Sequence, residues 1–165
     1  MTIRTGKRLW ACFLVNHIYR GTRCFEAKRR LLNGIGHDLG EGTKVVGPIF
    51  CTGILHTGKE CWIGADLTIH GNGRVILGDR CDVGPGVMFL TGGHRIGEPK
   101  RRAGEGITAD IRVGDGCWIG GRATLLPGTV LGEGSILAAC GCAAAAVEPH
   151  VLAGGIPAKM IRKLP

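Results

Sequence analysis

The chain has 165 residues, which is enough for one domain with a buried core. It contains 30 glycines with no glycine at every third position, and it is 44% hydrophobic, so collagen and a disordered chain are excluded. The formal net charge of +8 favours solubility and anionic partners. Because no nucleic-acid recognition motif accompanies this charge, we expect a small anionic molecule and no nucleic acid.

The cysteine content indicates a reducing environment. There are eight cysteines, but no credible signal peptide precedes them. An apolar run over residues 9–15 follows Lys7 and Arg8, yet it is too short to span a bilayer. The pair Cys140 and Cys142 lacks the two-residue gap of common zinc or redox pairs. We therefore predict a cytoplasmic protein with free cysteines, no integral membrane segment and no metal.

Residues 7–33 are expected to be helical. Large side chains recur at the spacing of one helix face, which comprises Trp10, Phe13, Leu14, His17 and Ile18. Gly21-Thr22 interrupts this pattern, and a second helix is expected over residues 24–32, before Asn33-Gly34. The segment is basic, through Arg20, Arg23, Lys28, Arg29 and Arg30. We interpret these charges as the solvated face of two packing helices, with binding to a membrane surface as the alternative.

From residue 39 onward the chain repeats every six residues. An apolar or small residue leads each unit, at Leu39, Val45, Cys51, Thr57, Ile63 and Ile69, then Leu77, Val83 and Phe89, and finally Val113, Ile119, Leu125, Leu131, Leu137 and Ala143. A step of eight separates Ile69 from Leu77, and residues 91–112 interrupt the repeat for about twenty residues. A loop of this length in a regular fold is usually functional.

Six residues fit one short strand and one corner, and three such sides close one coil of a parallel β-helix. Residues eighteen apart should then stack in adjacent coils at about 4.8 Å, as Val113 under Leu131 and Ile119 under Leu137. We expect the glycine after the leading residue to relieve crowding at a corner where a positive φ is useful. The fifth position should also point inward, which makes Cys61, Cys81 and Cys117 core residues rather than ligands or nucleophiles.

These patterns divide the chain into three parts. Residues 1–36 are the N-terminal helical segment, residues 37–153 are the β-helix with its extended loop 91–112, and residues 154–165 are a C-terminal cap. Within the cap, Pro157 is expected to open a short helix.

The repeat resembles that of the hexapeptide-repeat acyltransferases, which fold as a left-handed parallel β-helix. Three motifs make the resemblance more specific, namely Thr91-Gly92-Gly93-His94, Cys117-Trp118-Ile119-Gly120-Gly121 with the following Leu126-Pro127-Gly128, and Ala153-Gly154-Gly155-Ile156-Pro157-Ala158-Lys159. Together they are most similar to those of the sugar O-acetyltransferases, a branch that includes galactoside, maltose and capsular-polysaccharide acetyltransferases. This resemblance implies acetyl-CoA as donor, a homotrimer with active sites at subunit interfaces, and direct transfer in a ternary complex.

The resemblance matches the family's general base to His94. Histidine suits this role because its charge changes near neutral pH. Glu98, Glu105 or a backbone carbonyl could fix its tautomer, and the sequence does not choose between them. A backbone N–H near Gly120-Gly121 is the candidate donor to the developing oxyanion.

Coenzyme A has a long thin arm that needs a groove with few side chains. Gly121 and Ala139 are eighteen residues apart and should stack into such a strip, which Ala144 is expected to extend. By resemblance, Lys159 and Arg162 contact the cofactor's phosphates, and Trp118 either covers its reacting end or packs between subunits. The Thr-Lys-Asp segment common in the family is replaced here by three alanines, 144–146.

The acceptor is less defined. The eight-residue step forms a bulge around Asn72, where relatives place acceptor-binding groups, and basic residues crowd the long loop at Arg95, Lys100, Arg101 and Arg102. They form either a solvated face or a site for an anionic acceptor. N-acetylation of an amino sugar, O-acetylation of serine and a purely structural or binding solenoid remain alternatives. A zinc hydratase on the same solenoid would need converging histidines, and Pro99 stands where its second histidine is expected.

Overall fold

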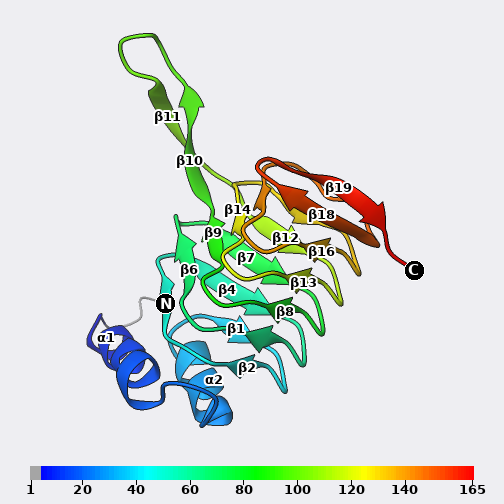
Figure 1. Ribbon diagram of the computed structural model, residues 1–165. Helices are drawn as coiled ribbons and strands as arrows, with labels where there is room; N and C mark the ends of the chain where they lie inside the picture. Colours follow the sequence, from blue (N-terminus) through cyan, green and yellow to red (C-terminus); the bar gives the residue numbers. More distant parts are fainter. Residues whose placement is uncertain (1–4) are drawn as a thin grey trace.

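The computed structural model describes residues 5–165 as two helices that cover one end of a three-sided parallel β-helix (Figure 1). α1 (Thr5–Phe13) continues into a short π-helical segment, η1 (Leu14–Ile18), and α2 (Phe25–Asn33) follows. The two predicted helices are thus confirmed, while residues 1–4 of the predicted helical segment lie outside the described part.

Each coil contributes one strand to each of three sheets, called sides A, B and C. Side A contains β1 (Asp38–Leu39), β4 (Ile54–Thr57), β7 (Arg74–Leu77), β12 (Ile111–Val113) and β15 (Val130–Leu131). Side B contains β2 (Lys44–Val45), β5 (Trp62–Ile63), β8 (Asp82–Val83), β13 (Trp118–Ile119), β16 (Ile136–Leu137), β18 (Val151–Gly155) and β19 (Ala158–Lys163). Side C contains β3 (Ile49–Cys51), β6 (Leu67–His70), β9 (Met88–Leu90), β14 (Thr124–Leu125) and β17 (Cys142–Ala143).

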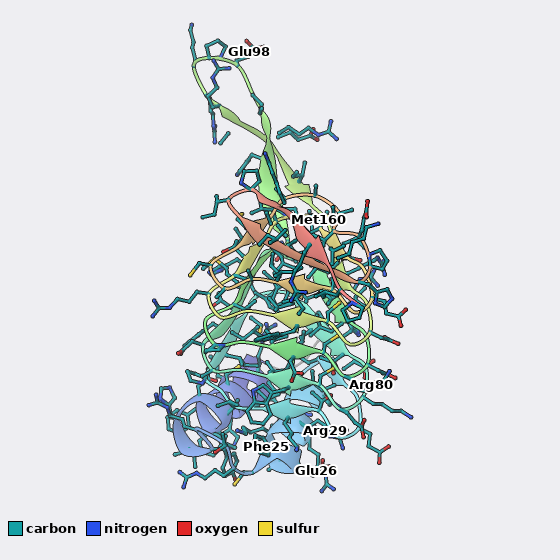
Figure 2. The ribbon with its side chains drawn as sticks, turned by 45° about the vertical axis from the view of Figure 1, so that its right-hand side comes forward. Phe25, Glu26, Arg29, Arg80, Glu98 and Met160 are labelled. Atoms are coloured by element: carbon teal, nitrogen blue, oxygen red, sulfur yellow. The ribbon has the colours of Figure 1, made fainter. Side chains whose placement is uncertain are left out.

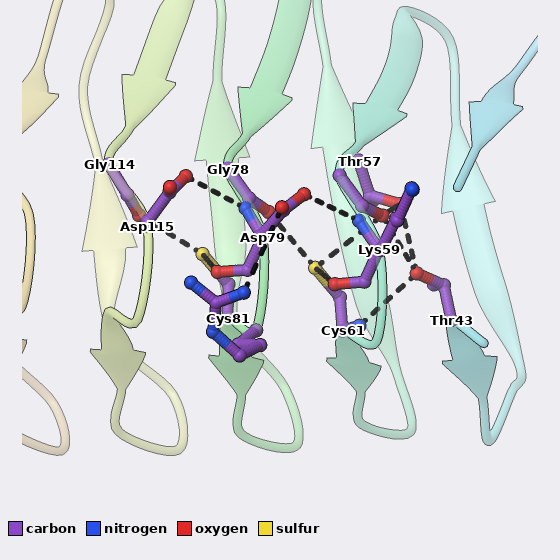
Figure 3. A network of polar contacts seen from close by, with 11 residues as sticks. Thr43, Thr57, Lys59, Cys61, Gly78, Asp79, Cys81, Gly114 and Asp115 are labelled. Atoms are coloured by element: carbon purple, nitrogen blue, oxygen red, sulfur yellow. Dashed lines mark hydrogen bonds and ion pairs between the residues drawn. The ribbon is translucent and has the colours of Figure 1, made fainter. Parts of the chain in front are cut away.

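The core is the stack of inward-pointing residues along the three sides. Val113 pairs with Leu131 and Ile119 with Leu137, so the predicted register is confirmed. Cys61, Cys81 and Cys117 are buried, as predicted. Each thiol donates a hydrogen bond to the carbonyl of a glycine in the next coil, at 3.1 Å, and Figure 3 shows this ladder for Cys61 and Cys81. Burial raises the pKa of Cys117, which keeps that thiol protonated.

The corner glycines relieve crowding, as expected, but they do not supply the positive φ of the turn. A Cβ on Gly84 would lie 2.6 Å from the nitrogen of Gly121, and one on Gly114 would lie 2.6 Å from the nitrogen of Glu133. These glycines are required because the next coil passes too close for any side chain. The positive φ falls two residues later in the turn, as at Gly86 and Gly116, and there Arg80 and Arg122 also adopt it. The expectation that the first glycine supplies the positive φ was therefore wrong.

The helices pack on the solenoid through a different face from the predicted apolar stripe. Ala11 and Val15 are buried against the first coil, and the Asn16 side chain bonds both the carbonyl and the N–H of Ile49. Lys28 is fully buried, where its ammonium donates to the carbonyls of Gly21 and Val46 at 2.7 and 2.9 Å. The stripe itself faces outward, with Trp10, Phe13, His17 and Ile18 exposed and Leu14 half-buried.

The C-terminal cap is a strand and not the short helix expected at Pro157. β19 pairs antiparallel with β18, from Gly155 opposite Ala158 to Val151 opposite Lys163. β18 is paired with β16 on one side only, so without β19 its other row of backbone groups would be left open. Strand pairing satisfies those groups, which a helix over the same residues would not do. No helix within residues 5–165 is long and apolar enough to cross a membrane.

Candidate active site

The long loop is an ordered β-hairpin. β10 (Gly92–Ile96) and β11 (Ala103–Thr108) pair antiparallel and leave the solenoid at the corner between sides C and A (Figure 1). Figure 2 shows Glu98 at the hairpin tip, far from Phe25 and Glu26 at the opposite end of the molecule. The interruption in the repeat therefore corresponds to a projecting arm whose base lies on the third and fourth coils.

Thr91 anchors the base of this hairpin. It is fully buried, and its hydroxyl donates to the carbonyl of His70 at 3.0 Å and accepts from the N–H of Gly73 at 3.1 Å. These bonds join the hairpin to the turn formed by residues 71–73, which is the bulge predicted from the eight-residue step. Asn72 lies exposed in that turn. The candidate acceptor turn is thus attached directly to the arm that carries the candidate base.

A bidentate ion pair supports the other strand of the arm. Arg74, directly after the turn, donates from Nε and Nη2 to Oδ2 of Asp110 at 3.0 and 2.6 Å. The hydrogen bonds from Arg74 hold the pKa of Asp110 below its usual range. Sequence reasoning missed both Thr91 and Asp110 as anchors. The eight-residue step between Ile69 and Leu77 was the available signal for these anchors. It adds two residues to a six-residue unit, and those residues must contact something beyond their own coil.

The tautomer of the neutral His94 ring follows from the hydrogen bond that one of its two ring nitrogens makes. Nδ1 lies 2.8 Å from the carbonyl oxygen of Gly104 on β11, and the side chain is otherwise exposed. Because a carbonyl only accepts, Nδ1 must carry the proton, which leaves Nε2 of the neutral ring as a free acceptor. Glu105 instead lies 3.7 Å from the guanidinium of Arg95. Of the three partners that the sequence left open, the structure selects the backbone carbonyl.

A second feature is a strip almost without side chains at the corner between sides B and C. We call it the small-residue column, and it consists of Gly84, Gly120, Gly121, Ala138, Ala139 and Gly154. A Cβ on Gly120 would lie 2.8 Å from the Cα of Ala139, and one on Gly154 would lie 2.9 Å from the Cβ of Ala138. The predicted stacking of Gly121 and Ala139 in adjacent coils therefore holds, and the strip continues over four coils.

The column offers free backbone donors. The N–H of Gly120 is used, since it donates to the carbonyl of Leu137 at 2.8 Å. Within residues 5–165, the N–H groups of Gly121 and Ala139 have no backbone acceptor. Two stacked amide donors beside a surface without side chains can bind the carbonyl groups of an extended ligand.

The C-terminal hairpin places Lys159 at the end of the column. Lys159 pairs with Gly154, whereas Arg162 pairs with Leu152, farther along the same hairpin, and both cations are exposed. Trp118 is about half exposed on the outer face of side B, where it lines a shallow groove with Trp62 and Asp82. Lys159 is therefore adjacent to the column, while Arg162 and Trp118 lie on the neighbouring face.

Ala144 does not extend the column. It follows β17, at the corner between sides C and A, because six residues after Ala138 the chain has turned one corner further. This is the corner of the hairpin, where Pro127 also lies, 3.6 Å from the Cβ position of Gly93. The expectation that Ala144 continues the strip was wrong, since the eighteen-residue period links Gly121 to Ala139 but not to Ala144.

Within one chain, His94 and the small-residue column occupy different corners. The column lies between sides B and C, the hairpin lies between sides C and A, and the whole of side C separates them. One chain therefore presents the two halves of the predicted site on different edges of the same prism. No group of three or more His, Cys, Asp or Glu side chains within residues 5–165 could hold a metal ion.

Comparison with known proteins identifies the class. Family models described as "Bacterial transferase hexapeptide (six repeats)" and "Hexapeptide repeat of succinyl-transferase" match residues 110–140 and 57–89. Galactoside O-acetyltransferase of Escherichia coli is 27% identical over 84% of this chain and 70% of its own length. Two proteins named "Putative acetyltransferase", from Saccharomyces cerevisiae and Schizosaccharomyces pombe, are 30% and 32% identical over 71% and 67% of this chain, and the match spans 61% and 53% of their own lengths.

Solved structures agree with this match. A hexapeptide-repeat acetyltransferase from Vibrio cholerae, in complex with acetyl coenzyme A, has a TM-score of 0.83 at 27% identity over 97% of this chain and 86% of its own. A galactoside acetyltransferase in complex with coenzyme A has a TM-score of 0.79 at 25% identity over 97% and 82% of the two chains.

The repeat, the hairpin and the coil stacking together define a hexapeptide-repeat acyltransferase, and the predicted fold class, a left-handed parallel β-helix, is confirmed. The predicted resemblance to the sugar O-acetyltransferases is confirmed by the similarity to galactoside O-acetyltransferase in sequence and in structure.

Proposed function

We propose that the protein transfers an acetyl group from acetyl-CoA to a hydroxyl group of a sugar or glycan, with His94 as general base in a ternary complex. The observation that carries this proposal is the hydrogen bond from Nδ1 of His94 to the carbonyl of Gly104, at 2.8 Å. It leaves Nε2 as an exposed acceptor on an arm whose backbone is fixed at both strands. A general base requires such a free acceptor at a defined position.

The small-residue column is the proposed seat of the pantetheine arm. It carries no side chain larger than a methyl group over four coils, and the N–H groups of Gly121 and Ala139 have no backbone acceptor in the described chain. Lys159 at its end supplies a positive charge for the cofactor's phosphates, with Arg162 farther along the same hairpin. Trp118 lies on the face of side B next to this path and remains a proposed contact of the cofactor. Ala144 lies at the corner of the hairpin and remains a proposed contact only on the subunit that contributes His94.

The proposed reaction needs no residue that forms a covalent intermediate. Nε2 of His94 accepts the proton of the acceptor hydroxyl as the hydroxyl oxygen attacks the thioester carbonyl. The C–S bond then breaks, and the protonated ring gives this proton to the sulfur, so that coenzyme A leaves as the thiol. The N–H of Gly121 is the better oxyanion donor of the two candidates, because the N–H of Gly120 is already bonded to Leu137. The buried thiols take no part in this scheme.

The complete site is proposed to form between subunits of a homotrimer. His94 and the small-residue column lie at different corners of one chain, so a neighbouring copy must bring its column to the hairpin. This arrangement also explains why the hairpin projects away from its own solenoid. Asn72, in the turn bonded to Thr91, would then face the acceptor.

The proposal is tested by a panel of acceptors with acetyl-CoA, in which thiol release is measured for galactosides, maltose, other glycans, amino sugars and serine. Thiol release with a sugar that carries only hydroxyl groups is the expected result. Release confined to amino sugars or to serine would contradict the proposed acceptor class. Failure of acetyl-CoA to bind in calorimetry would contradict the enzyme itself and favour a structural solenoid.

A further inference from the structure

The outward face of α1 is apolar and has no partner within residues 5–165. Leu9, Trp10 and Phe13 are 67%, 62% and 45% exposed, and the rings of Trp10 and Phe13 stack with centroids 5.8 Å apart. The helix is fixed to the solenoid through its opposite side, by Ala11 and by Val15 of η1. A contiguous exposed apolar patch on a firmly packed helix marks an interaction surface rather than a loosely folded segment.

Most of the chain's net charge lies in the helical segment that carries this patch. Residues 5–33 contain seven of the 21 Lys and Arg residues and one of the 13 Asp and Glu residues, so they carry six of the eight net positive charges. That one acid, Glu26, is already engaged by Arg29 and Arg30. Lys7, Arg20 and Arg23 are exposed, and the ion pairs among residues 5–165 do not include them.

Trp10 lies between two hollows of different character. One is apolar and is lined by Leu9, Trp10 and Phe13. The other lies between α1 and α2 and is lined by Lys7, Trp10, Arg30 and Leu31, among others. The ammonium of Lys7 reaches to 3.7 Å from the Cβ position of Gly34, at the end of α2. An apolar surface and a cation-lined groove thus meet at a single tryptophan.

We propose that this face, formed by α1 and the adjoining groove against α2, docks on an anionic lipid surface. Leu9, Trp10 and Phe13 would enter the boundary between headgroups and acyl chains, while Lys7 and Arg30 bind headgroup phosphates. A short helix with tryptophan and phenylalanine on one side and cations beside them is typical of peripheral membrane binding. Binding of this kind requires no membrane-spanning helix and does not depend on the proposed acetyl transfer.

Charge distinguishes a lipid surface from a second copy of the chain. A symmetric contact through this face would bring the same excess of cations together from both copies, and like charges across an interface oppose association. Anionic phosphates remove that repulsion, and the apolar side chains then become buried at the same time. The observations therefore favour lipid over self-association.

The test is sedimentation of the full-length protein with vesicles of phosphatidylcholine alone or with about one third phosphatidylglycerol, at low salt and without acetyl-CoA. We expect binding to the anionic vesicles only, weakened by added salt. Trp10→Ala with Phe13→Ala should weaken binding at least tenfold. Lys7→Gln with Arg30→Gln should weaken it roughly 30-fold, from the loss of two surface cations. Ile96→Ala, which removes an even more exposed aliphatic side chain on the distant hairpin, should bind normally.

Three results would overturn the inference. The first is wild-type protein that stays in the supernatant with anionic vesicles, because the face then does not bind lipid. The second is equal binding to neutral vesicles, because the cations then have no role. The third is analytical ultracentrifugation in which Trp10→Ala with Phe13→Ala reduces the size of the assembly, because the face would then join copies of the chain. Circular dichroism of each variant checks that the exposed substitutions leave the fold unchanged.

Discussion

At His94 the backbone, rather than an acidic side chain, decides which ring nitrogen carries the proton. The sequence offered Glu98 and Glu105 as partners because both lie in the same loop, but strand pairing sets the actual neighbour. His94 stands opposite Gly106, and the ring bonds to the carbonyl of Gly104 two residues away. Hairpin register cannot be predicted from composition, so this partner could be found only in the structure.

His37 shows the opposite environment and gives a pH-dependent prediction. It is buried, and its Nδ1 accepts a hydrogen bond from the N–H of Leu55 at 3.1 Å. Burial, assisted by the charges of Arg8 and His56, lowers the pKa of His37 from 6.5 to about 4. Because the folded protein holds the neutral ring, this contribution is fully present above pH 6.5 and is lost as the pH falls towards 4.

Urea unfolding at several pH values checks this expectation against His37→Asn, whose amide oxygen can accept the same bond. Between about pH 7.5 and 4.5 the wild type should lose roughly 2 to 3 kcal/mol more unfolding free energy than the variant. Parallel pH profiles for the two proteins would show that His37 does not titrate on unfolding in this way.

At the level of elements, the hairpin and the Gly71–Gly73 turn behave as one unit because Thr91 joins them. The sequence predicted that residues 91–112 leave the repeat, and that the step of eight forms a bulge, but it did not link the two features. The link depends on a buried hydroxyl between His70 and Gly73, in coils that the chain visits about twenty residues apart. Such a contact can be predicted only from the way the coils stack, and the six-residue period alone does not give it.

Thr91→Val tests this link, since valine has the same shape but leaves the buried N–H of Gly73 without a partner. We expect a loss of about 1 to 3 kcal/mol in unfolding free energy, measured by urea denaturation. Thr52 is a matched control, because its hydroxyl makes the same pair of bonds to Gly71 but is exposed to water. Thr52→Val should therefore cost clearly less, and equal losses for both variants would contradict the anchoring role.

For the whole molecule, the sequence predicted the coils much better than their ends. The six-residue period fixed the stacking of Val113 on Leu131 and the burial of Cys81, because each coil repeats the contacts of its neighbour. The ends lack this repetition. Pro157 lies in the turn before a strand that covers an open edge, and the stripe that contains Trp10 faces outward. Both outcomes depend on which surfaces remain unpaired after the coils have formed.

The candidate site also depends on the whole molecule, because it needs two corners of the prism. If a trimer joins the His94 corner of one chain to the column of the next, two inactive variants should complement each other. His94→Ala removes the base, and Ala139→Trp should block the column. Co-expression in mixed trimers should restore about one quarter of wild-type activity, since one site in four receives both intact halves. No recovery in verified mixed trimers would place the site within one chain.

The most direct test of the proposed mechanism is the turnover of His94→Ala with acetyl-CoA and the best acceptor from the panel, followed by thiol release. If His94 is the base, kcat should fall at least about a hundredfold, the usual scale for removal of a general base. His17→Ala, an exposed histidine on η1 at the other end of the molecule, should keep normal turnover. Near-normal turnover of a correctly folded His94→Ala would contradict the assignment of His94 as the base.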